Sequence, residues 1–141
     1  MSQPARPSDV PPHFQSFLAF DFGLKRTGVA SGNRLLHAAT PQRTIRAEAA
    51  EARLKEVEAR VREWQPDALV VGVPFHPDGA SHENTARARK FARQLRARFP
   101  RLPVYEVDER YSTTEALSGG AADAGAGAAC VILEQFLRSI G

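Results

Sequence analysis

The sequence predicts a single α/β domain in which a mixed central sheet is flanked by helices. Apolar runs of strand length alternate with amphipathic helical patterns along the 141 residues, which is the order of a layered α/β protein. The run ALVVGV at 68–73 is almost wholly apolar, as is typical of a central parallel strand covered on both faces. A chain of this length suits one domain with a hydrophobic core of its own.

The first half of the chain predicts three strands and one helix. Residues 17–21 form a short run of β-forming side chains. Residues 28–31 and 35–39 suit two further strands, joined by a turn at 32–34, so the three strands are expected to form an antiparallel unit. The segment Gln-Pro-Asp at 65–67 ends the helix that follows. The apolar stripe of this helix consists of Ala47, Ala50, Leu54, Val57, Val61 and Trp64.

The second half predicts parallel crossovers, which complete the order β-β-β-α-β-α-β-α. The strand 68–73 is followed by a loop at 74–80 and a helix, and a strand at 103–107 precedes the last helix. The segment STTE at 112–115 matches a helix-capping box. The stripes of the two helices consist of Ala88, Phe91, Ala92, Leu95 and Phe99, and of Ala126, Ala129, Ile132, Leu133, Phe136 and Ile140.

The composition excludes several classes of protein. Hydrophobic residues make up 43% and charged residues 25% of the chain, which are ordinary values for a globular domain. No apolar run approaches membrane-spanning length, and no membrane partner is expected. The proline-rich residues 1–15 predict a disordered tail without the pattern of a secretory signal, before a domain at 16–141. Cys130 is the single cysteine, so neither an intrachain disulfide nor a cysteine-based metal site is expected, and the protein is predicted to be cytoplasmic.

Asp21 is the most informative residue for function, because it stands at the end of the first apolar strand. A lone carboxylate is costly to bury, so an acid at this position is not explained by core packing. The segment 24–30 follows Gly23 and brings Lys25 and Arg26 next to the acid in a turn. This arrangement suits a metal ion and a phosphate group, whereas a solvated turn aspartate is the structural alternative.

Asp108 and Glu109 form a second acidic strand end. Sites of α/β sheets lie beyond the carboxyl ends of the strands. If the first and last strands are neighbours, Asp21 and one residue of the pair can share a divalent cation, Mg²⁺ or Mn²⁺. Side chains alternate along a strand, so only one of Asp108 and Glu109 can face that site. The alternative is a solvated strand end that pairs with Arg110.

The segment 81–99 carries a strongly basic helix. Its only acid is Glu83, and its basic residues occupy most of the helix surface outside the apolar stripe. Because a solvated helix usually mixes both signs, such a face indicates a polyanionic partner. A soluble surface without a partner is the alternative. The basic residues are Arg87, Arg89, Lys90, Arg93, Arg96 and Arg98.

Four segments in order resemble a known family. They are FDFGLKRTGVA at 20–30, VVGVP at 70–74, DERYST at 108–113 with Glu-Ala at 115–116, and AACVILEQFL at 128–137. On these motifs the chain resembles the YqgF family of RNase H-like proteins, named pre-16S rRNA nucleases and earlier Holliday junction resolvases. The resemblance runs from about residue 17 to the end of the chain. It implies an RNase H-like fold, a cytoplasmic location and a role in maturing the 5′ end of small-subunit ribosomal RNA.

The resemblance also bears on the acidic residues of the site. Asp21 and Glu109 match the first two acidic positions of the family. The third acidic position falls on Gly125, and Asp123 lies two residues earlier, about 200° around an intact helix. Asp123 is therefore either a displaced third ligand or a helix N-cap.

These observations predict a metal-dependent endonuclease of structured RNA. Asp21 and Glu109 would bind Mg²⁺ or Mn²⁺, with Asp108 and Asp123 as additional candidates. Pre-rRNA within the small-subunit precursor is the expected partner, and branched DNA is the alternative substrate. A non-catalytic RNA- or ribosome-binding module that lacks the third acid is the competing class, and the oligomeric state stays open. The expected substrate-binding cations are Lys25, Arg26, Arg89, Arg93 and Arg110.

Overall fold

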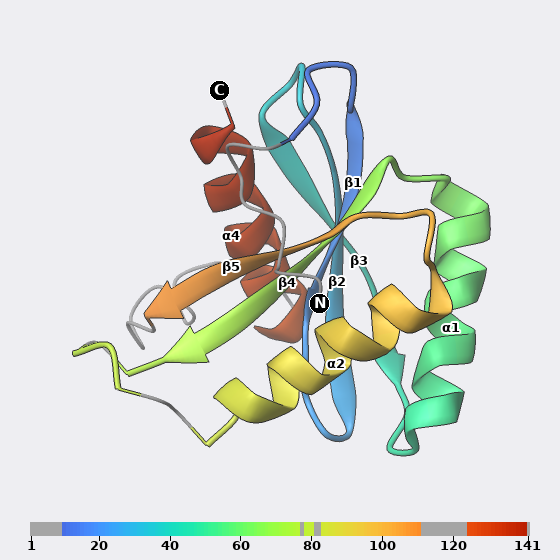
Figure 1. Ribbon diagram of the computed structural model, residues 1–141, viewed down its shortest axis with the longest axis vertical. Coiled ribbons are helices and arrows are strands. Elements are labelled where there is room, and N and C mark those ends of the chain that lie inside the picture. Colours follow the sequence, from blue (N-terminus) through green and yellow to red (C-terminus); the bar gives the residue numbers. More distant parts are fainter. Residues whose placement is uncertain (1–9, 77, 81–82, 111–123, 141) are drawn as a thin grey trace.

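The computed structural model describes residues 10–76, 78–80, 83–110 and 124–140 of the chain and is shown in Figure 1. The order of its strands and helices confirms the predicted β-β-β-α-β-α-β-α arrangement. The last strand extends further than expected, to the acidic pair and Arg110. The elements are β1 (Ser16–Asp21), β2 (Arg26–Asn33), β3 (Ala38–Arg46), α1 (Ala50–Trp64), β4 (Ala68–Phe75), α2 (Thr85–Arg98), β5 (Val104–Arg110) and α4 (Ala124–Ser139).

The strands form one five-stranded sheet in the order β3-β2-β1-β4-β5. β1, β2 and β3 pair antiparallel, whereas β4 runs parallel to β1 and β5 runs parallel to β4. The predicted mixed α/β sheet, with a three-strand antiparallel unit and parallel strands, is therefore confirmed. β1 and β5 are not neighbours, because β4 lies between them.

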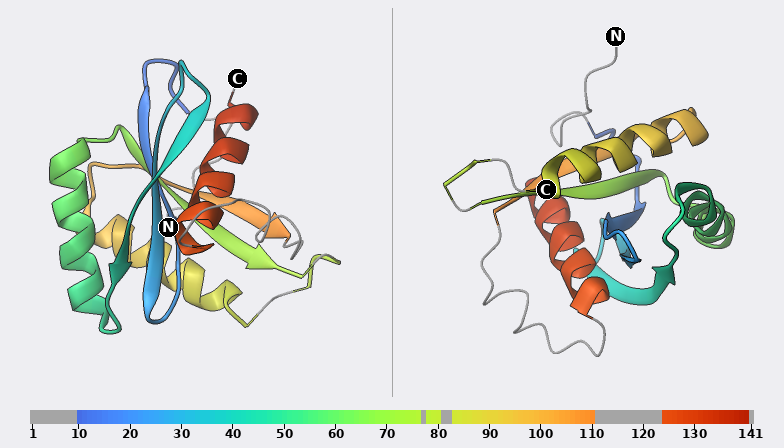
Figure 2. Two further views of the ribbon diagram at one scale, coloured as in Figure 1. Left: turned by 180° about the vertical axis from the view of Figure 1, so that it is seen from behind. Right: turned by 90° about the horizontal axis from the view of Figure 1, so that it is seen from below.

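Helices cover both faces of the sheet, as Figure 2 shows. α4 packs on one face, which we call the α4 face, and α1 and α2 pack on the other, which we call the α1/α2 face. The side chains alternate between two apolar clusters, as expected for covered strands. The cluster on the α4 face includes Phe17, Ala19, Val70, Tyr105 and Phe136. The cluster on the α1/α2 face includes Leu18, Phe20, Leu54, Val71 and Phe91.

The connection between β2 and β3 differs from the prediction of a strand at 35–39. Leu35 and Leu36 lie in the turn and are 80% and 74% exposed. The turn is closed by Asn33, whose Oδ1 accepts a hydrogen bond from the backbone N–H of Leu35 at 2.8 Å. His37 then adopts a positive φ of 52°. Local hydrogen bonding by an asparagine side chain therefore outweighs the apolar character of the two leucines.

Residues 10–15 belong to the folded part of the chain, although the sequence assigned them to the disordered tail. Val10 is only 8% exposed and packs in the cluster on the α4 face. Arg34 Nη1 donates hydrogen bonds to the carbonyl oxygens of Pro11 at 2.8 Å and Phe14 at 3.1 Å. The Oδ2 atom of Asp67 accepts hydrogen bonds from the backbone N–H groups that begin β1. Contacts with residues far along the chain thus order this segment.

No helix in the described part of the chain combines the length and apolar character required to span a bilayer.

An ion-pair cluster joins the two helices of the α1/α2 face. The two outer nitrogens of Arg98 donate to both carboxylate oxygens of Glu51, at 3.0 and 2.9 Å. Nη2 also donates to Glu58 Oε1 at 2.9 Å. These hydrogen bonds from Arg98 hold the pKa of both glutamate carboxyls below the ordinary value of 4.5. The cluster therefore fixes the end of α2 against α1.

We predict that Arg98→Gln destabilises the fold near neutral pH, and that its effect shrinks in acid. A carboxyl whose pKa is depressed by folding stabilises the fold above its unfolded pKa and loses that contribution as pH falls through its folded pKa. The difference in the free energy of unfolding between the parent protein and Arg98→Gln should therefore become smaller below about pH 4.5. Urea denaturation at about pH 7 and pH 3.5 measures it. Arg87→Gln is the matched control, because among the described residues Arg87 bonds only to the Asn84 side chain. If Arg98→Gln lowers the free energy of unfolding equally at both pH values, the ion pairs with Glu51 and Glu58 do not explain the stabilisation.

Candidate active site

Asp21 is the last residue of β1 and lies at the carboxyl edge of the sheet. Phe17 and Ala19 belong to the cluster on the α4 face. Because strand side chains alternate, the side chain of Asp21 lies on the same face. The register with β2 sets Asp21 opposite Gly28, which has no side chain to crowd the carboxylate. A paired, rigid strand therefore fixes where this carboxylate stands.

Glu109 lies near the end of β5 on the same face as Asp21. Tyr105, four residues earlier, belongs to the cluster on the α4 face, so alternation directs Glu109 toward α4 as well. Glu109 is buried, with 6% of its surface exposed. Asp108 is exposed and faces the α1/α2 side, away from Asp21. Of the acidic pair, only Glu109 therefore shares a face with Asp21.

Gly72 of β4 lies between the two acidic strands. Phe20 of β1 pairs with Val71, so Gly72 follows at the level of Asp21. A Cβ atom built at Gly72 would meet Ile132 Cδ1 at 2.3 Å and Glu109 Cγ at 3.5 Å. The first and last strands are therefore not neighbours, although the prediction that Asp21 and one residue of the acidic pair share a cation required them to be. The strand between them carries a glycine at this level, on which α4 packs directly.

The N-terminal end of α4 lies toward the same carboxyl edge. Phe136 packs against Phe17 and Tyr105, near the beginnings of β1 and β5, with ring centroids 5.2 and 5.3 Å apart. Ile132, one turn earlier, lies over Gly72 near the ends of the strands. The helix therefore runs from the carboxyl edge toward the amino edge of the sheet.

Position 125 lies seven residues before Ile132, on the same side of α4. Seven residues are about two helical turns, or about 10.5 Å along the axis. Helical spacing therefore puts Gly125 in line with Ile132, nearer the N-terminal end of α4, and glycine has no carboxylate. Asp123, the other candidate for the third acid, lies outside the described residues. Among the residues that are described, no three His, Cys, Asp or Glu side chains come together as a metal site.

Lys25 ends the turn that follows Asp21 and Arg26 begins β2, and both are exposed. The turn is tight, since a Cβ atom at Gly23 would lie 2.3 Å from the carbonyl oxygen of Arg26. The carbonyl oxygen of Lys25 accepts a hydrogen bond from the backbone N–H of Ala47 at 3.2 Å. Two solvent-facing cations thus lie at the same end of the β1–β2 hairpin as Asp21. The side chain of Arg110, the last residue of β5, lies outside the described part.

The basic helix α2 is less cationic than its sequence indicates. Arg96 pairs with Glu106 of β5 at 3.0 Å, and Arg89 approaches the same carboxylate at 3.8 Å. Arg89 also lies over the Phe75 ring, 5.3 Å from its centroid. Arg98 is held by the two glutamates of α1. The sequence could not reveal these acids, because they belong to other elements.

Three cations of α2 stay exposed without a carboxylate partner among the described residues: Arg87, Lys90 and Arg93. They lie on the α1/α2 face, opposite Asp21 and Glu109. The first turn of α2 is nevertheless close to the acidic edge, because the Thr85 hydroxyl donates to the carbonyl oxygen of Pro74, which pairs with Glu109 in the sheet. Fewer cations of α2 therefore lack a described carboxylate partner than the sequence indicates; Arg93 is one of them, whereas Arg89 contacts Glu106 and Phe75.

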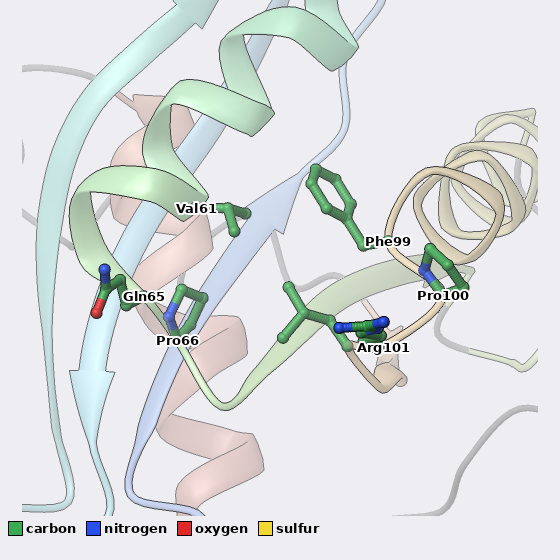
Figure 3. A pocket seen from close by; sticks show the side chains of 7 residues that line it. Val61, Gln65, Pro66, Phe99, Pro100 and Arg101 are labelled. Atoms are coloured by element: carbon green, nitrogen blue, oxygen red, sulfur yellow. The ribbon is translucent and has the colours of Figure 1, made fainter.

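The pocket drawn in Figure 3 has a volume of about 480 Å³ and lies away from the acidic edge. It opens between the end of α1 and the connection from α2 to β5, where the parallel strands begin. Its lining is mostly apolar and contains no carboxylate, so it does not suit a metal ion. The lining residues are Val61, Gln65, Pro66, Phe99, Pro100, Arg101 and Leu102.

Comparison of the sequence with known proteins gives a match over nearly the whole chain. The family model RuvX, described as Holliday junction resolvase, matches residues 15–139. A protein of Polaromonas sp. strain JS666 is 75% identical over 126 residues, which cover 89% of this chain and 90% of the relative. A protein of Albidiferax ferrireducens is 67% identical over 140 residues, which cover 96% of this chain and 88% of the relative. Both relatives are named "Putative pre-16S rRNA nuclease".

Among solved structures, the chain is similar to RuvC of Thermus thermophilus. The RuvC structure in complex with a Holliday junction substrate superposes with a TM-score of 0.56 at 18% identity, covering 89% of this chain and 95% of that one. A second RuvC structure gives a TM-score of 0.58 at 16% identity, with 88% and 95% coverage. At such identities the likeness shows the fold alone, which is RNase H-like.

We predict that Gly72→Ala destabilises the fold by about 1–3 kcal/mol, because the added methyl group overpacks the contact with Ile132. The same change made in an Ile132→Ala background should cost less, because the smaller side chain vacates the space. Urea denaturation of the four proteins completes a double-mutant cycle. An equal cost of Gly72→Ala in both backgrounds would show that the close approach of α4 does not explain the glycine.

Proposed function

Because the chain belongs to the RuvX (YqgF) family of Holliday junction resolvases, we propose that it is a metal-dependent endonuclease of structured RNA. The expected reaction is phosphodiester hydrolysis during 5′-end processing of pre-16S rRNA, in the cytoplasm. The observation that carries the proposal is the placement of Asp21 and Glu109 on one face at one sheet edge. The names of the curated relatives favour RNA, whereas branched DNA is the alternative substrate.

The donor set of this edge suits a divalent cation. Two carboxylates that share one site repel each other when both are ionised, and a cation between them relieves the repulsion. Hard ions such as Mg²⁺ or Mn²⁺ prefer carboxylate oxygens and retain several waters. Asp21 and Glu109 would hold the ion, which when bound polarises a phosphate oxygen and activates water.

The remaining residues of the edge would bind and orient the substrate. Lys25 and Arg26 lie in the turn next to Asp21 and would contact the phosphates that flank the scissile bond. Their exposure leaves both free to follow a flexible backbone. Arg87, Lys90 and Arg93 would bind more distant phosphates beyond the first turn of α2.

A non-catalytic RNA- or ribosome-binding module is the second candidate function. Position 125 lies in the first turn of α4, in line with Ile132, and glycine provides no ligand there. With two carboxylates the chain can hold one ion, while a second ion and the leaving oxygen gain less support. This reading predicts RNA binding with weak or absent cleavage.

A cleavage assay distinguishes the two functions. Precursor rRNA and a four-way DNA junction are incubated with the protein in Mg²⁺ and in EDTA. We expect weak, Mg²⁺-dependent cleavage of RNA that Asp21→Asn lowers at least about tenfold, as loss of a metal ligand requires. Gly125→Asp should raise the rate of RNA cleavage, because it adds a carboxylate at the third acidic position. Asp108→Asn is the matched control, because it removes an exposed acid from the opposite face of the sheet.

Three outcomes would change the conclusion. RNA binding without cleavage, by both the natural chain and Gly125→Asp, would favour the binding module. Cleavage of the junction but not of RNA would favour a resolvase. If Asp123→Asn abolishes cleavage by the natural chain, Asp123 is the third ligand and Gly125 is not the vacant position.

We also predict that the three cations of α2 that have no carboxylate partner in the described part of the chain set the salt dependence of RNA binding. Each lost phosphate contact lowers the slope of log K against log salt by about 0.7–0.9. Replacing Arg87, Lys90 and Arg93 together by Gln should therefore flatten the slope by about 2 to 3. Replacing Arg96 and Arg98, whose charges are held by carboxylates, should change it little. Equal slopes for the parent and the triple variant would show that α2 is only a solvated surface.

A further inference from the structure

Arg53 of α1 is a buried cation whose guanidinium, in the described part of the chain, contacts backbone carbonyl oxygens and an aromatic ring. It is 4% exposed, and its Nη2 atom donates to the carbonyl oxygens of Leu24 at 2.8 Å, Ala47 at 3.2 Å and Glu48 at 3.2 Å. Its guanidinium carbon lies 4.6 Å from the centroid of the Phe22 ring. No carboxylate in the described part of the chain forms an ion pair with it.

A cation in this setting is costly to the fold. Burial without an opposite charge disfavours the ionised form, and burial lowers the pKa of the Arg53 guanidinium. An apolar side chain of similar length would fill the same space without this cost. An apolar residue cannot, however, donate the hydrogen bonds that Arg53 makes to the carbonyl oxygens of Leu24, Ala47 and Glu48.

These hydrogen bonds hold the turn that follows Asp21. Phe22 is anchored from two sides, by Arg53 and by Phe91 of α2, whose ring centroid is 5.3 Å away. Leu24 is 52% exposed, so its own side chain contributes little anchoring, and its carbonyl oxygen is held by Arg53 instead. The same guanidinium binds the segment just after β3, which in turn donates to the Lys25 carbonyl oxygen.

We propose that Arg53 is a positioning residue for the candidate metal and phosphate site. It fixes the turn 22–26 from the α1/α2 face, while the carboxylate of Asp21 lies on the α4 face. Fixing the turn orients that carboxylate for a divalent ion and presents Lys25 and Arg26 to phosphate. Arg53 itself contacts neither ion nor substrate. The inference rests on the proposed function and extends it to a residue outside the site.

Arg53→Met tests the proposal, with Arg60→Met as the matched control. Arg60 lies seven residues later on the same side of α1, is also 4% exposed, and has a pKa lowered chiefly by burial. Both variants remove a buried cation from one helix, but only Arg53 binds the turn. Arg53→Lys, which keeps the charge but not the planar fork, is the second variant in case Arg53→Met does not fold.

Two measurements separate positioning from general stability. In metal-free protein, amide hydrogen exchange of residues 23–26 should rise at least about tenfold in Arg53→Met and stay at the parent value in Arg60→Met. In a Mg²⁺ titration followed by the Gly23 amide NMR signal, the midpoint should rise about 10- to 100-fold in Arg53→Met, the range seen when a partner that orients a metal ligand is lost. RNA affinity in EDTA should change less than about twofold, since the exposed cations remain.

Two results would overturn the proposal. One is that Arg53→Met and Arg60→Met change the amide hydrogen exchange and the Mg²⁺ midpoint by equal amounts. The other is that Arg53→Met changes neither quantity. The hydrogen-exchange measurement needs no metal, so it tests the role of Arg53 even if the parent protein shows no response to Mg²⁺. A parent protein that does not respond to Mg²⁺ would contradict the proposed metal site. Amide hydrogen exchange at the parent rate in Arg53→Met would contradict only the proposed role of Arg53.

Discussion

The direct contact between Ile132 and the backbone of Gly72 is the constraint on which the acidic edge depends. β4 separates the two acidic strands, so their backbones are about 9.6 Å apart, twice the spacing of neighbouring strands. A side chain at position 72 would occupy the strip of sheet between Asp21 and Glu109. The glycine instead lets α4 sit directly on β4, with the stem of Glu109 beside it. The depth at which α4 sits also sets how close position 125 comes to the two carboxylates.

The fold divides its charges between the two faces of the sheet. The carboxylates of Asp21 and Glu109 belong to the α4 face, while the exposed cations Arg87, Lys90 and Arg93 belong to the α1/α2 face. The bond from Thr85 to Pro74 joins the two regions at the carboxyl edge. A polyanion that touches both must therefore pass over this edge near the end of β4. A flexible single-stranded segment can follow such a path more easily than a straight duplex, because a duplex resists bending over so short a length.

Local patterns predicted the order of elements, because periodicity and burial agree along this chain. The same reasoning placed Asp21 at a strand end, and alternation alone required that only one of Asp108 and Glu109 share its face. Strand neighbours were beyond such reasoning, since they depend on how crossovers pack in three dimensions. The pairing of Arg89, Arg96 and Arg98 was hidden for a related reason: their acids lie on other elements, 10 to 47 residues away in the sequence. Arg53 gave no sequence signal at all, because a mixed-charge helix does not show which arginine is buried.

The attachment of residues 10–15 has a practical consequence for labelling the protein. This segment is fastened where β1 begins, by Arg34 and Asp67, and Asp21 stands at the other end of that six-residue strand. At about 3.3 Å per residue the separation is about 20 Å. A fluorophore or affinity peptide joined at His13, which is exposed in this segment, would thus be tethered at the edge remote from the carboxylates. Surface immobilisation through that end would leave the acidic edge accessible to long RNA in single-molecule experiments.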